Sequence, residues 1–452
     1  MLPSAPLRHF LGLAALVVVV CSGCPEGPGD EGGGSSSGGG GGSSSSGRAG
    51  SSGAVSSSGG SPSSGASSSL GSPSSGATSG SPDGGVGPDG GSCDLGTPGA
   101  PDRERVVMLS HTFTDVPATP GTWVRTLGWK VGQLPEDTGV RVDVGARIMR
   151  LAFVPSGTYA LALGDDGDLV SLRVDGVANV VEVDRVTLPS AGFEDLVVAA
   201  DGRRVWAVGS NVAETAGLST VDLGCDGALT VLEGAFFNIR LAESLVLLPG
   251  GTQAILLGGQ AAFDPVDNDD TRLLALVPGG GFTSVAAFDL WSDFLDVGRI
   301  GLSPAGDLLV VPNSSPFSSE GGQVRIFTVT GDSIASAQVP QDVPSAREVL
   351  FSPDGLTVLI SRDENNRVAV FRRDGNQLTP TTEVTGIGLA SQMAMVTRGL
   401  DSGRVVVPSV DPSGGPNLAV FRVTGPGAAL YEGQLELGSG SDQIPEAVAV
   451  QP

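Results

Sequence analysis

The stretch VLFSPDGLTVLIS, residues 349–361, decides the fold, because two apolar runs flank a Ser-Pro-Asp-Gly turn. Pro and Gly set the backbone angles of a tight hairpin turn, so the stretch predicts a strand, a turn and a second strand. Five close variants of it occur along the chain: LAFVPSGTYALALG (151–164), LVVAADGRRVWAVG (196–209), LVLLPGGTQAILLG (245–258), IGLSPAGDLLVVPN (300–313) and MAMVTRGLDSGRVVVPS (393–409). The starts of the six stretches lie 45, 49, 55, 49 and 44 residues apart. This spacing indicates an internal structural repeat.

Each repeat also contains a third strand that ends in a Gly turn, such as RVAVFRRDG (367–375), and a fourth strand behind it. Periods of this length with four strands each are typical of propeller blades, and six whole blades can be traced. The chain ends in EAVAVQP (446–452), which predicts a first strand, and PDRERVVMLS (101–110) supplies a second. The sequence therefore predicts an all-β, seven-bladed β-propeller whose last blade is shared between the two ends of the domain and closes the ring.

The N-terminal residues 1–23 indicate export. An apolar run of 11 residues, FLGLAALVVVV, is too short to span a bilayer and precedes the small pair Ser22-Gly23. This segment resembles the bacterial lipoprotein signal, which implies lipidation of Cys24 and attachment to a membrane through that lipid. Cys21 fits the lipidated position poorly, because the bulky Val20 precedes it. An ordinary secretory signal that is cut nearby is the alternative.

Composition and charge predict the organisation of the remaining chain. Residues 24–100 are almost wholly Gly, Ser, Pro and Ala and cannot bury enough apolar surface to order, so we expect a disordered tether before a propeller over 101–452. The formal net charge is −24, and the region from Pro101 onward carries 43 acidic and 23 basic residues. Such a surface repels phosphate backbones, so we expect no nucleic-acid partner. Pro25 stands where an inner-membrane retention signal would have Asp, which favours the outer membrane.

Two repeats carry a resemblance to a known family. FSPDGLTVLISRDENNRVAVFRRDGNQL (351–378) and LSPAGDLLVVPN (302–313) resemble repeats of the lactonase-type seven-bladed propellers, which include 6-phosphogluconolactonase-like and muconate-cyclase-like proteins. The likeness covers nearly all of the region from Pro101 to Pro452. It implies the propeller fold and ligand binding at one end of the central channel. No local motif places a catalytic residue, so the catalytic residues stay unknown at this stage.

The candidate ligand face combines charged residues from several repeats. Arg150, Asp195, Arg299 and Glu348 occupy the same place ahead of the turn in their repeats, so we expect a ring of mixed charge at the channel mouth. The alternative is that these residues pair with each other and only cap the barrel. His111 is the one His left after signal cleavage, and we expect it in a loop of the shared blade on the same face. It could act as a base beside Asp115 or be simply solvated.

Metal, cofactor and disulfide signals are weak. The residues Asp264, Asp267, Asp269 and Asp270 could place oxygens around Ca²⁺, but they lack the EF-hand spacing, so a solvated acidic loop is favoured. We therefore expect no metal site and no cofactor. Cys93 and Cys225 could form a disulfide because export favours oxidation, and two free thiols fit the sequence equally well.

The sequence leaves the function open between two classes. The first is a non-catalytic binding or scaffold domain of an exported, lipid-anchored protein of the cell envelope, with an unidentified protein or small-molecule ligand. The alternative is a lactonase-type hydrolase that acts on a small cyclic ester at the channel face. The low His count and the lack of a nucleophile motif lean against an enzyme.

Overall fold

The structure is a computed structural model, and its description covers residues 93–100, 103–113, 123–189, 191–210, 215–240, 242–258, 270–277, 279–290, 298–314, 322–362, 367–387, 392–410, 416–437 and 443–452. The predicted signal peptide, Cys24 and most of the predicted tether lie outside these residues. The described part of the chain forms strands and no helix. It accordingly holds no helix long and apolar enough to cross a membrane.

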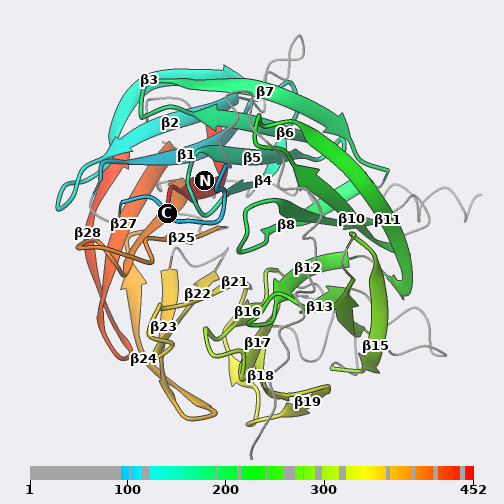
Figure 1. Cartoon of the computed structure of the whole chain (residues 1–452). Coiled ribbons are helices and arrows are strands. Elements are labelled where there is room, and N and C mark those ends of the chain that lie inside the picture. The colour runs from blue at the N-terminus through cyan, green and yellow to red at the C-terminus, as the bar shows by residue number, and fades with distance from the viewer. Residues whose placement is uncertain are drawn as a thin grey trace, which may run out of the picture. The chain divides into compact units, whose positions relative to one another are not determined.

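The strands form seven separate sheets, which follow one another around a ring in chain order (Figure 1). Blade 1 consists of β4 (Ile148–Phe153), β5 (Tyr159–Gly164), β6 (Asp168–Val174) and β7 (Val180–Thr187). Blade 2 consists of β8 (Ala191–Val198), β9 (Arg204–Ser210), β10 (Thr215–Leu223) and β11 (Leu229–Arg240). Blade 3 consists of β12 (Ala242–Leu247), β13 (Gln253–Gly258), β14 (Thr271–Leu276) and β15 (Phe282–Phe288).

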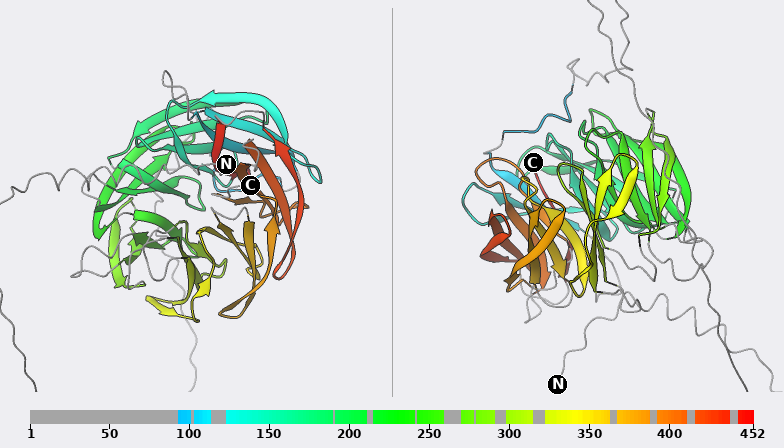
Figure 2. Two further views of the ribbon diagram at one scale, coloured as in Figure 1. Left: turned by 180° about the vertical axis from the view of Figure 1, so that it is seen from behind. Right: turned by 90° about the horizontal axis from the view of Figure 1, so that it is seen from below.

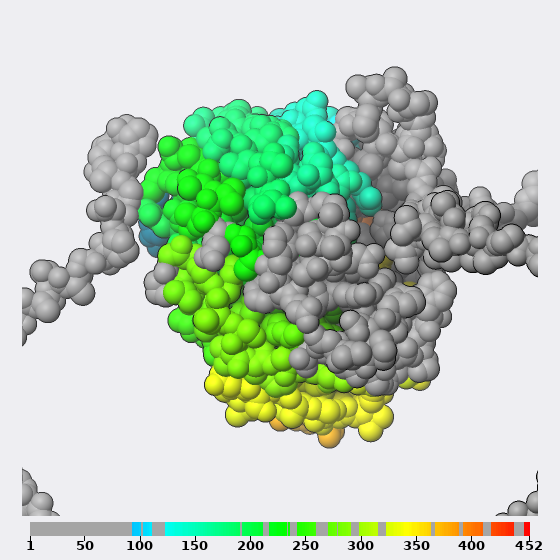
Figure 3. Space-filling view, turned by 90° about the vertical axis from the view of Figure 1, so that its right-hand side faces the viewer, coloured from blue at the N-terminus to red at the C-terminus, as the bar shows by residue number. Residues whose placement is uncertain are grey.

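The next three blades repeat this antiparallel order. Blade 4 consists of β16 (Gly301–Leu302), β17 (Leu308–Asn313), β18 (Gln323–Thr330) and a divided outer strand, β19 (Ser333–Ser336) and β20 (Gln341–Asp342). Blade 5 consists of β21 (Ala346–Phe351), β22 (Thr357–Arg362), β23 (Arg367–Asp374) and β24 (Gln377–Thr385). Blade 6 consists of β25 (Ala394–Met395), β26 (Arg404–Val410), β27 (Pro416–Gly425) and β28 (Ala428–Glu436). In Figure 3 the colours of successive blades follow one another across one side of the molecule.

Blade 7 joins the two ends of the domain, as the sequence predicted. It consists of β29 (Gln443–Val450), β1 (Arg105–Phe113), β2 (Trp123–Trp129) and β3 (Glu136–Asp143). The C-terminal β29 pairs antiparallel with β1, and Leu109 lies opposite Val448. This pairing joins the two ends of the domain in one sheet and so closes the ring. The all-β, seven-bladed propeller with a shared blade is confirmed.

The core lies between neighbouring blades. Seven clusters of buried apolar side chains occupy the seven junctions, and each cluster draws its members from two adjacent blades. The second strands are covered on both faces, so β5 and β17 are buried along their whole length. Strands of this kind are apolar at nearly every position, which explains why the repeats read as continuous apolar runs.

The turns between first and second strands gather at one end of the ring, here called the turn face, and the inner strands begin at the opposite end, here called the channel face. Gly157, Gly202 and Gly355 occupy equivalent turn positions and have φ of 73°, 72° and 71°. Only glycine adopts this backbone region without strain, which accounts for the Gly of the Ser-Pro-Asp-Gly motif. Figure 2 shows the ring from behind and from below.

The residues 93–100 form a strap that packs on the turn face. Cys93 and Cys225 are joined as a disulfide with their Cα atoms 5.6 Å apart. The Leu95 side chain is buried in the core between blades 1 and 2, and its carbonyl accepts a hydrogen bond from the Ser156 amide at 2.9 Å. The Arg398 side chain of blade 6 donates to the Gly99 carbonyl at 3.1 Å. The described propeller therefore extends N-terminal of Pro101, into the segment predicted as tether.

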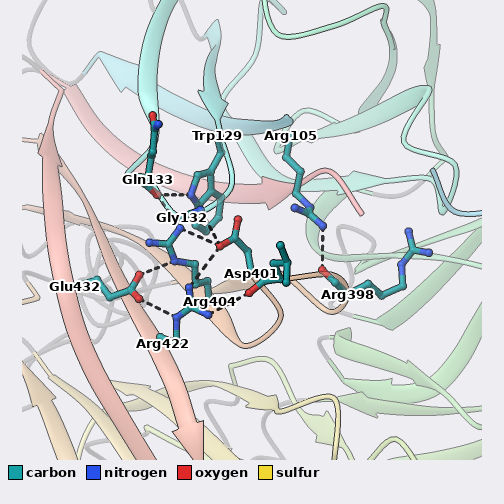
Figure 4. Close-up of polar contacts among 10 residues, drawn as sticks. Arg105, Trp129, Gly132, Gln133, Arg398, Asp401, Arg404, Arg422 and Glu432 are labelled. Carbon is teal, nitrogen blue, oxygen red and sulfur yellow. Dashed lines mark hydrogen bonds and ion pairs between the residues drawn. The ribbon is translucent and has the colours of Figure 1, made fainter. Parts of the chain in front are cut away.

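A buried ion-pair cluster holds blade 6 against the shared blade 7 (Figure 4). Arg404 Nε lies 2.6 Å from Glu432, and Arg404 Nη1 lies 3.2 Å from Asp401. Arg422 pairs with the same two carboxylates at 2.8 and 3.4 Å. The Arg404 guanidinium also lies over the Trp129 ring of blade 7, 5.5 Å from its centroid. The cluster therefore links the blade built from both chain ends to its neighbour.

Candidate functional site at the channel

One position of the inner strand repeats around the channel with a polar side chain in six of seven blades. It directly precedes the first of the two large apolar residues that alternate along the inner strand before the hairpin turn, and we call its occupants the channel ring. The channel ring consists of Arg150, Asp195, Ser244, Arg299, Glu348, Gln392 and Ala447, from blades 1 to 7 in order. The residue that follows the ring position is large and apolar in every blade, so the ring lies beside an apolar layer of the inner strands.

Irregular strand pairing sets the orientation of the ring residues. In blades 1, 2, 3 and 5 the register between the inner strand and its neighbour shifts immediately before or at the ring residue. In blade 5 the shift lies between Ala346 and Val349, and the freed Glu348 amide donates to Ser361 Oγ at 3.0 Å. The Ala447 amide of blade 7 likewise donates to Ser110 Oγ at 2.8 Å. Bulges of this kind turn a side chain away from the regular alternation, which directs these residues to the channel.

Asp195 is contacted from three other blades: its two neighbours, blades 1 and 3, and blade 4 beyond them. Its carboxylate is fully buried and lies 3.7 Å from Arg150 Nε and 3.4 Å from Arg299 Nε. Ser244 Oγ donates to Asp195 Oδ2 at 2.9 Å. Because Ser244 is short, the guanidinium of Arg299 in blade 4 reaches across blade 3 to the carboxylate in blade 2. Asp195 therefore orients Arg299 and holds its charge in the channel.

Glu348 is the second carboxylate of the ring and is also buried. Arg299 Nη1 donates to Glu348 Oε1 at 3.2 Å, and the Met393 amide donates to Glu348 Oε2 at 2.5 Å. Burial raises the pKa of Glu348 above its usual range, although Arg299 and Arg150 oppose this shift. The Asp195 carboxylate and, less strongly, Glu348 raise the pKa of Arg299. The pair thus combines a permanently charged guanidinium with a carboxylate that is more basic than an exposed one.

The accessibility of the ring differs among its members. The side chain of Arg299 is 36% exposed, whereas that of Glu348 is 3% exposed. Gln392 Nε2 of blade 6 donates to the Met149 carbonyl of blade 1 at 2.7 Å, so it spans the Ala447 position of blade 7. A small molecule in the channel would therefore meet the Arg299 guanidinium first, with Glu348 behind it.

The structure brings together four of the five residues predicted for this face, namely Arg150, Asp195, Arg299 and Glu348. The prediction that His111 lies in a loop is wrong for its backbone, because His111 pairs with Trp123 and Pro445 inside β1. The side chain of His111 and the whole of Asp115 lie outside the described residues.

Ser244 and Gln392 belong to the ring but were not among the predicted residues. Their signal was positional, because both precede the large apolar residue of their repeat. Uncharged side chains made that position less conspicuous than the arginines and carboxylates did.

The weak calcium prediction rested on four aspartates, of which the structure describes only Asp270. Its carboxylate accepts hydrogen bonds from Thr271 Oγ1 at 2.6 Å and from the Leu290 amide at 3.1 Å. Asp264, Asp267 and Asp269 lie outside the described residues. The described part of the chain contains no group of three His, Cys, Asp or Glu residues suited to a metal ion.

The fold and the channel ring define a seven-bladed β-propeller with a polar, ion-paired layer across its channel. No family model matches the chain, and no curated protein matches it. Solved structures do match it. The periplasmic gluconolactonase of Pseudomonas aeruginosa is 14% identical with a TM-score of 0.58, covering 75% of this chain and 99% of that chain. A protein of Bacteroides uniformis provisionally named a 6-phosphogluconolactonase is 15% identical with a TM-score of 0.59, covering 77% and 100%.

A third structure, from Bacteroides fragilis and named in the same provisional way, is 14% identical with a TM-score of 0.56, covering 78% and 99% of the two chains. These likenesses confirm the predicted resemblance to lactonase-type propellers for the fold. The prediction of a non-catalytic binding or scaffold domain is corrected here, because three structures that share the fold over nearly their whole length are named as gluconolactonase or 6-phosphogluconolactonase.

Proposed function

We propose that the protein is a lactonase-type hydrolase that opens a small cyclic ester in the channel. The observation that carries the proposal is the hydrogen bond between Arg299 and Glu348 at 3.2 Å, in a ring that also holds Asp195. The names of the similar structures support the same reaction class. The low His count does not oppose it, because a carboxylate can serve as the base and a guanidinium as the electrophile.

The chemistry of lactone opening assigns a role to each member of this pair. Arg299, the exposed member, would hydrogen-bond the lactone carbonyl and stabilise the oxyanion that forms when water adds to the carbonyl carbon. Glu348 would take a proton from that water and return it to the ring oxygen as the C–O ester bond breaks. The product is a single hydroxy acid, which carries the new alcohol and a carboxylic acid that loses its proton near neutral pH. Asp195 is a positioning residue in this scheme, since it contacts Arg299 and not the lactone.

The test is hydrolysis of an aldonolactone by the purified full-length protein, with and without Arg299→Met. We expect catalysed opening by the unaltered protein and a loss of kcat of about 10²–10³-fold in the variant, because one oxyanion donor is removed. Arg367→Met is the matched control, since Arg367 pairs with Glu383 on β24 of blade 5, outside the channel ring. Failure of the unaltered protein to exceed the uncatalysed rate on a panel of lactones would contradict the proposal, as would full activity of Arg299→Met.

We also infer that the protein is exported and held at the cell envelope, in the outer membrane rather than the inner, by a lipid on Cys24. Support comes from the sequence alone: the short apolar run, the small pair Ser22-Gly23 and Pro25 after the cysteine. We expect the mature protein to begin at a diacylated Cys24, which mass spectrometry of the N-terminal peptide can establish. An unmodified N-terminus at any other residue would refute the anchor.

A further inference from the structure

We propose that Gly298 and Gly301 are positioning residues for lactone opening, because their lack of side chains lets the inner strands of blades 4 and 5 join through main-chain hydrogen bonds that hold Arg299 beside Glu348. The inference rests on the proposed function and adds two residues that carry no reactive group. It follows from the main-chain contacts at this junction and from the space around the two glycines.

A parallel β-bridge between Arg299 and Glu348 joins the inner strands of blades 4 and 5. The Arg299 amide donates to the Arg347 carbonyl at 2.7 Å, and the Val349 amide donates to the Arg299 carbonyl at 3.0 Å. Both main-chain groups of Arg299 are therefore bound to the next blade, and β16 pairs with β17 only from Gly301 onward. Among the described residues this is the one β-bridge outside the named strands. Figure 1 shows β16 beside β21 at this junction.

The two glycines allow the strands to approach this closely. A Cβ atom added to Gly298 would lie 1.5 Å from the Arg347 carbonyl oxygen. A Cβ atom added to Gly301 would lie 2.5 Å from Val349 Cγ1 and 3.1 Å from the Val349 carbonyl oxygen. Carbon atoms pack at about 3.5–4.0 Å, so either side chain would force the two strands apart by about 1 Å or more.

The other blades carry side chains at both places. The position directly before the channel ring, which Gly298 occupies in blade 4, has no glycine in any other blade. The position of Gly301, two residues after the ring residue, is taken in the other blades by Ala152, Val197, Val246, Leu350, Ala394 and Ala449. The main-chain bridge thus occurs at the one junction where glycine occupies both positions, and that junction carries the proposed catalytic pair.

The bridge fixes the backbone from which the Arg299 side chain extends. On the other side of the same segment, the Ile300 amide donates to Ser244 Oγ of blade 3 at 3.3 Å, so neighbouring blades hold the segment from both sides. From this fixed backbone the guanidinium meets Glu348 Oε1 at 3.2 Å. A displacement of about 1 Å in a catalytic group can lower a rate by about 10²-fold, which makes the spacing of these two strands important for the reaction.

The experiment compares the opening of an aldonolactone by full-length Gly301→Ala and by the unaltered protein. We expect kcat to fall by about 10–10²-fold. Glu348 is faced by Arg299 from blade 4, by Arg150 from blade 1 and by the Met393 amide from blade 6, all of which oppose the rise that burial causes in its pKa. Withdrawal of Arg299 should therefore raise that pKa further and move the low-pH fall in kcat/KM to higher pH, which a loss of stability alone would not do.

Gly425→Ala is the matched control. Gly425 ends β27 of blade 6, and nothing beyond its chain neighbours lies within 4 Å of an added Cβ atom, so this variant should keep kcat and the pH profile. A double-mutant cycle with Arg299→Met tests the route of the effect. If Gly301 acts through Arg299, Gly301→Ala should lower kcat little further in the Arg299→Met background, and a full further loss there would contradict the positioning role.

Hydrogen exchange tests the bridge without an activity assay. The Arg299 and Val349 amides should exchange slowly in the unaltered protein and about tenfold faster in Gly301→Ala. Fast exchange of both amides in the unaltered protein would overturn the positioning role, whether or not the variant folds. Unchanged kcat and pH profile in a folded Gly301→Ala would do the same and leave the lactonase reading in place. Absence of turnover by the unaltered protein would overturn both.

Discussion

Replacing Glu348 with Gln is expected to lower kcat for lactone opening by about 10²–10⁴-fold, the range that a positioned general base contributes. Gln keeps the shape of Glu, and its one amide oxygen can accept the hydrogen bond from Arg299 or the one from the Met393 amide, which Glu348 accepts on separate oxygens. It cannot take a proton from water. The variant therefore separates the proposed base from a merely structural member of the channel ring.

The pH profile gives a second measurement of the same residue. Burial raises the pKa of Glu348, so the carboxylate takes up its proton at a higher pH than an exposed glutamate does. We expect kcat/KM to fall as the pH is lowered through that raised pKa, because the base becomes protonated and loses its function. The residual activity of Glu348→Gln should lack this acidic limb.

Glu383→Gln is the matched control for Glu348→Gln. Glu383 lies on β24 and pairs with Arg362 at 2.7 Å, so the change again neutralises an ion-paired glutamate, but outside the channel ring. We expect it to retain kcat and the acidic limb. Near-normal kcat in a folded Glu348→Gln protein would remove Glu348 from the mechanism.

Replacing Arg404 with Met is expected to lower the free energy of unfolding by about 3 kcal/mol, because it leaves buried carboxylates without their main partner. The Arg404 side chain is 5% exposed and contacts Asp401, Glu432 and the Trp129 ring (Figure 4). Arg422 still pairs with both carboxylates, which places the loss at the low end for a buried ion pair. Chemical denaturation of the full-length protein measures the change.

Arg173→Met provides the comparison for Arg404→Met. Arg173 pairs with Asp175 at 2.9 Å, but both side chains are close to half exposed, so its removal should cost below about 1 kcal/mol. The difference between the two losses in free energy of unfolding measures how much burial at the junction of blades 6 and 7 contributes to stability. An equal, small loss in both would show that the cluster does not hold the shared blade in place.

The ring closure and the channel ring differ in how far the sequence predicts them. The stretch 349–361 and its variants specify strands locally, through turn residues and apolar runs, and the strand-like segments at both ends of the domain complete the seventh sheet. The charges of Arg299 and Glu348 also stand out at equivalent repeat positions. The contacts of these residues cannot be predicted from the repeat positions, because Arg299 reaches Asp195 only where the short Ser244 side chain leaves room across blade 3.

Two further differences have the same origin in long-range packing. Residues 93–100 resemble the Gly- and Pro-rich tether in composition, yet Leu95 is buried between blades 1 and 2 and Cys93 is bonded to Cys225. His111 precedes a loop-like sequence, yet its backbone stays in β1 because β2 and β29 pair with it from both sides. In both cases a partner lies far away along the chain. Cys225 is 132 residues from Cys93, and β29 lies at the other end of the domain from His111.

The sequence by itself determined the number of blades, the all-β class and the shared blade, because those features depend on local turn chemistry and on the period of the apolar pattern. The tertiary structure alone decided which ring residues touch, how far Glu348 is buried and whether Cys93 and Cys225 are bonded. These depend on the curvature of the ring and on the register shifts of the inner strands, which set the direction of each side chain and which no local pattern encodes.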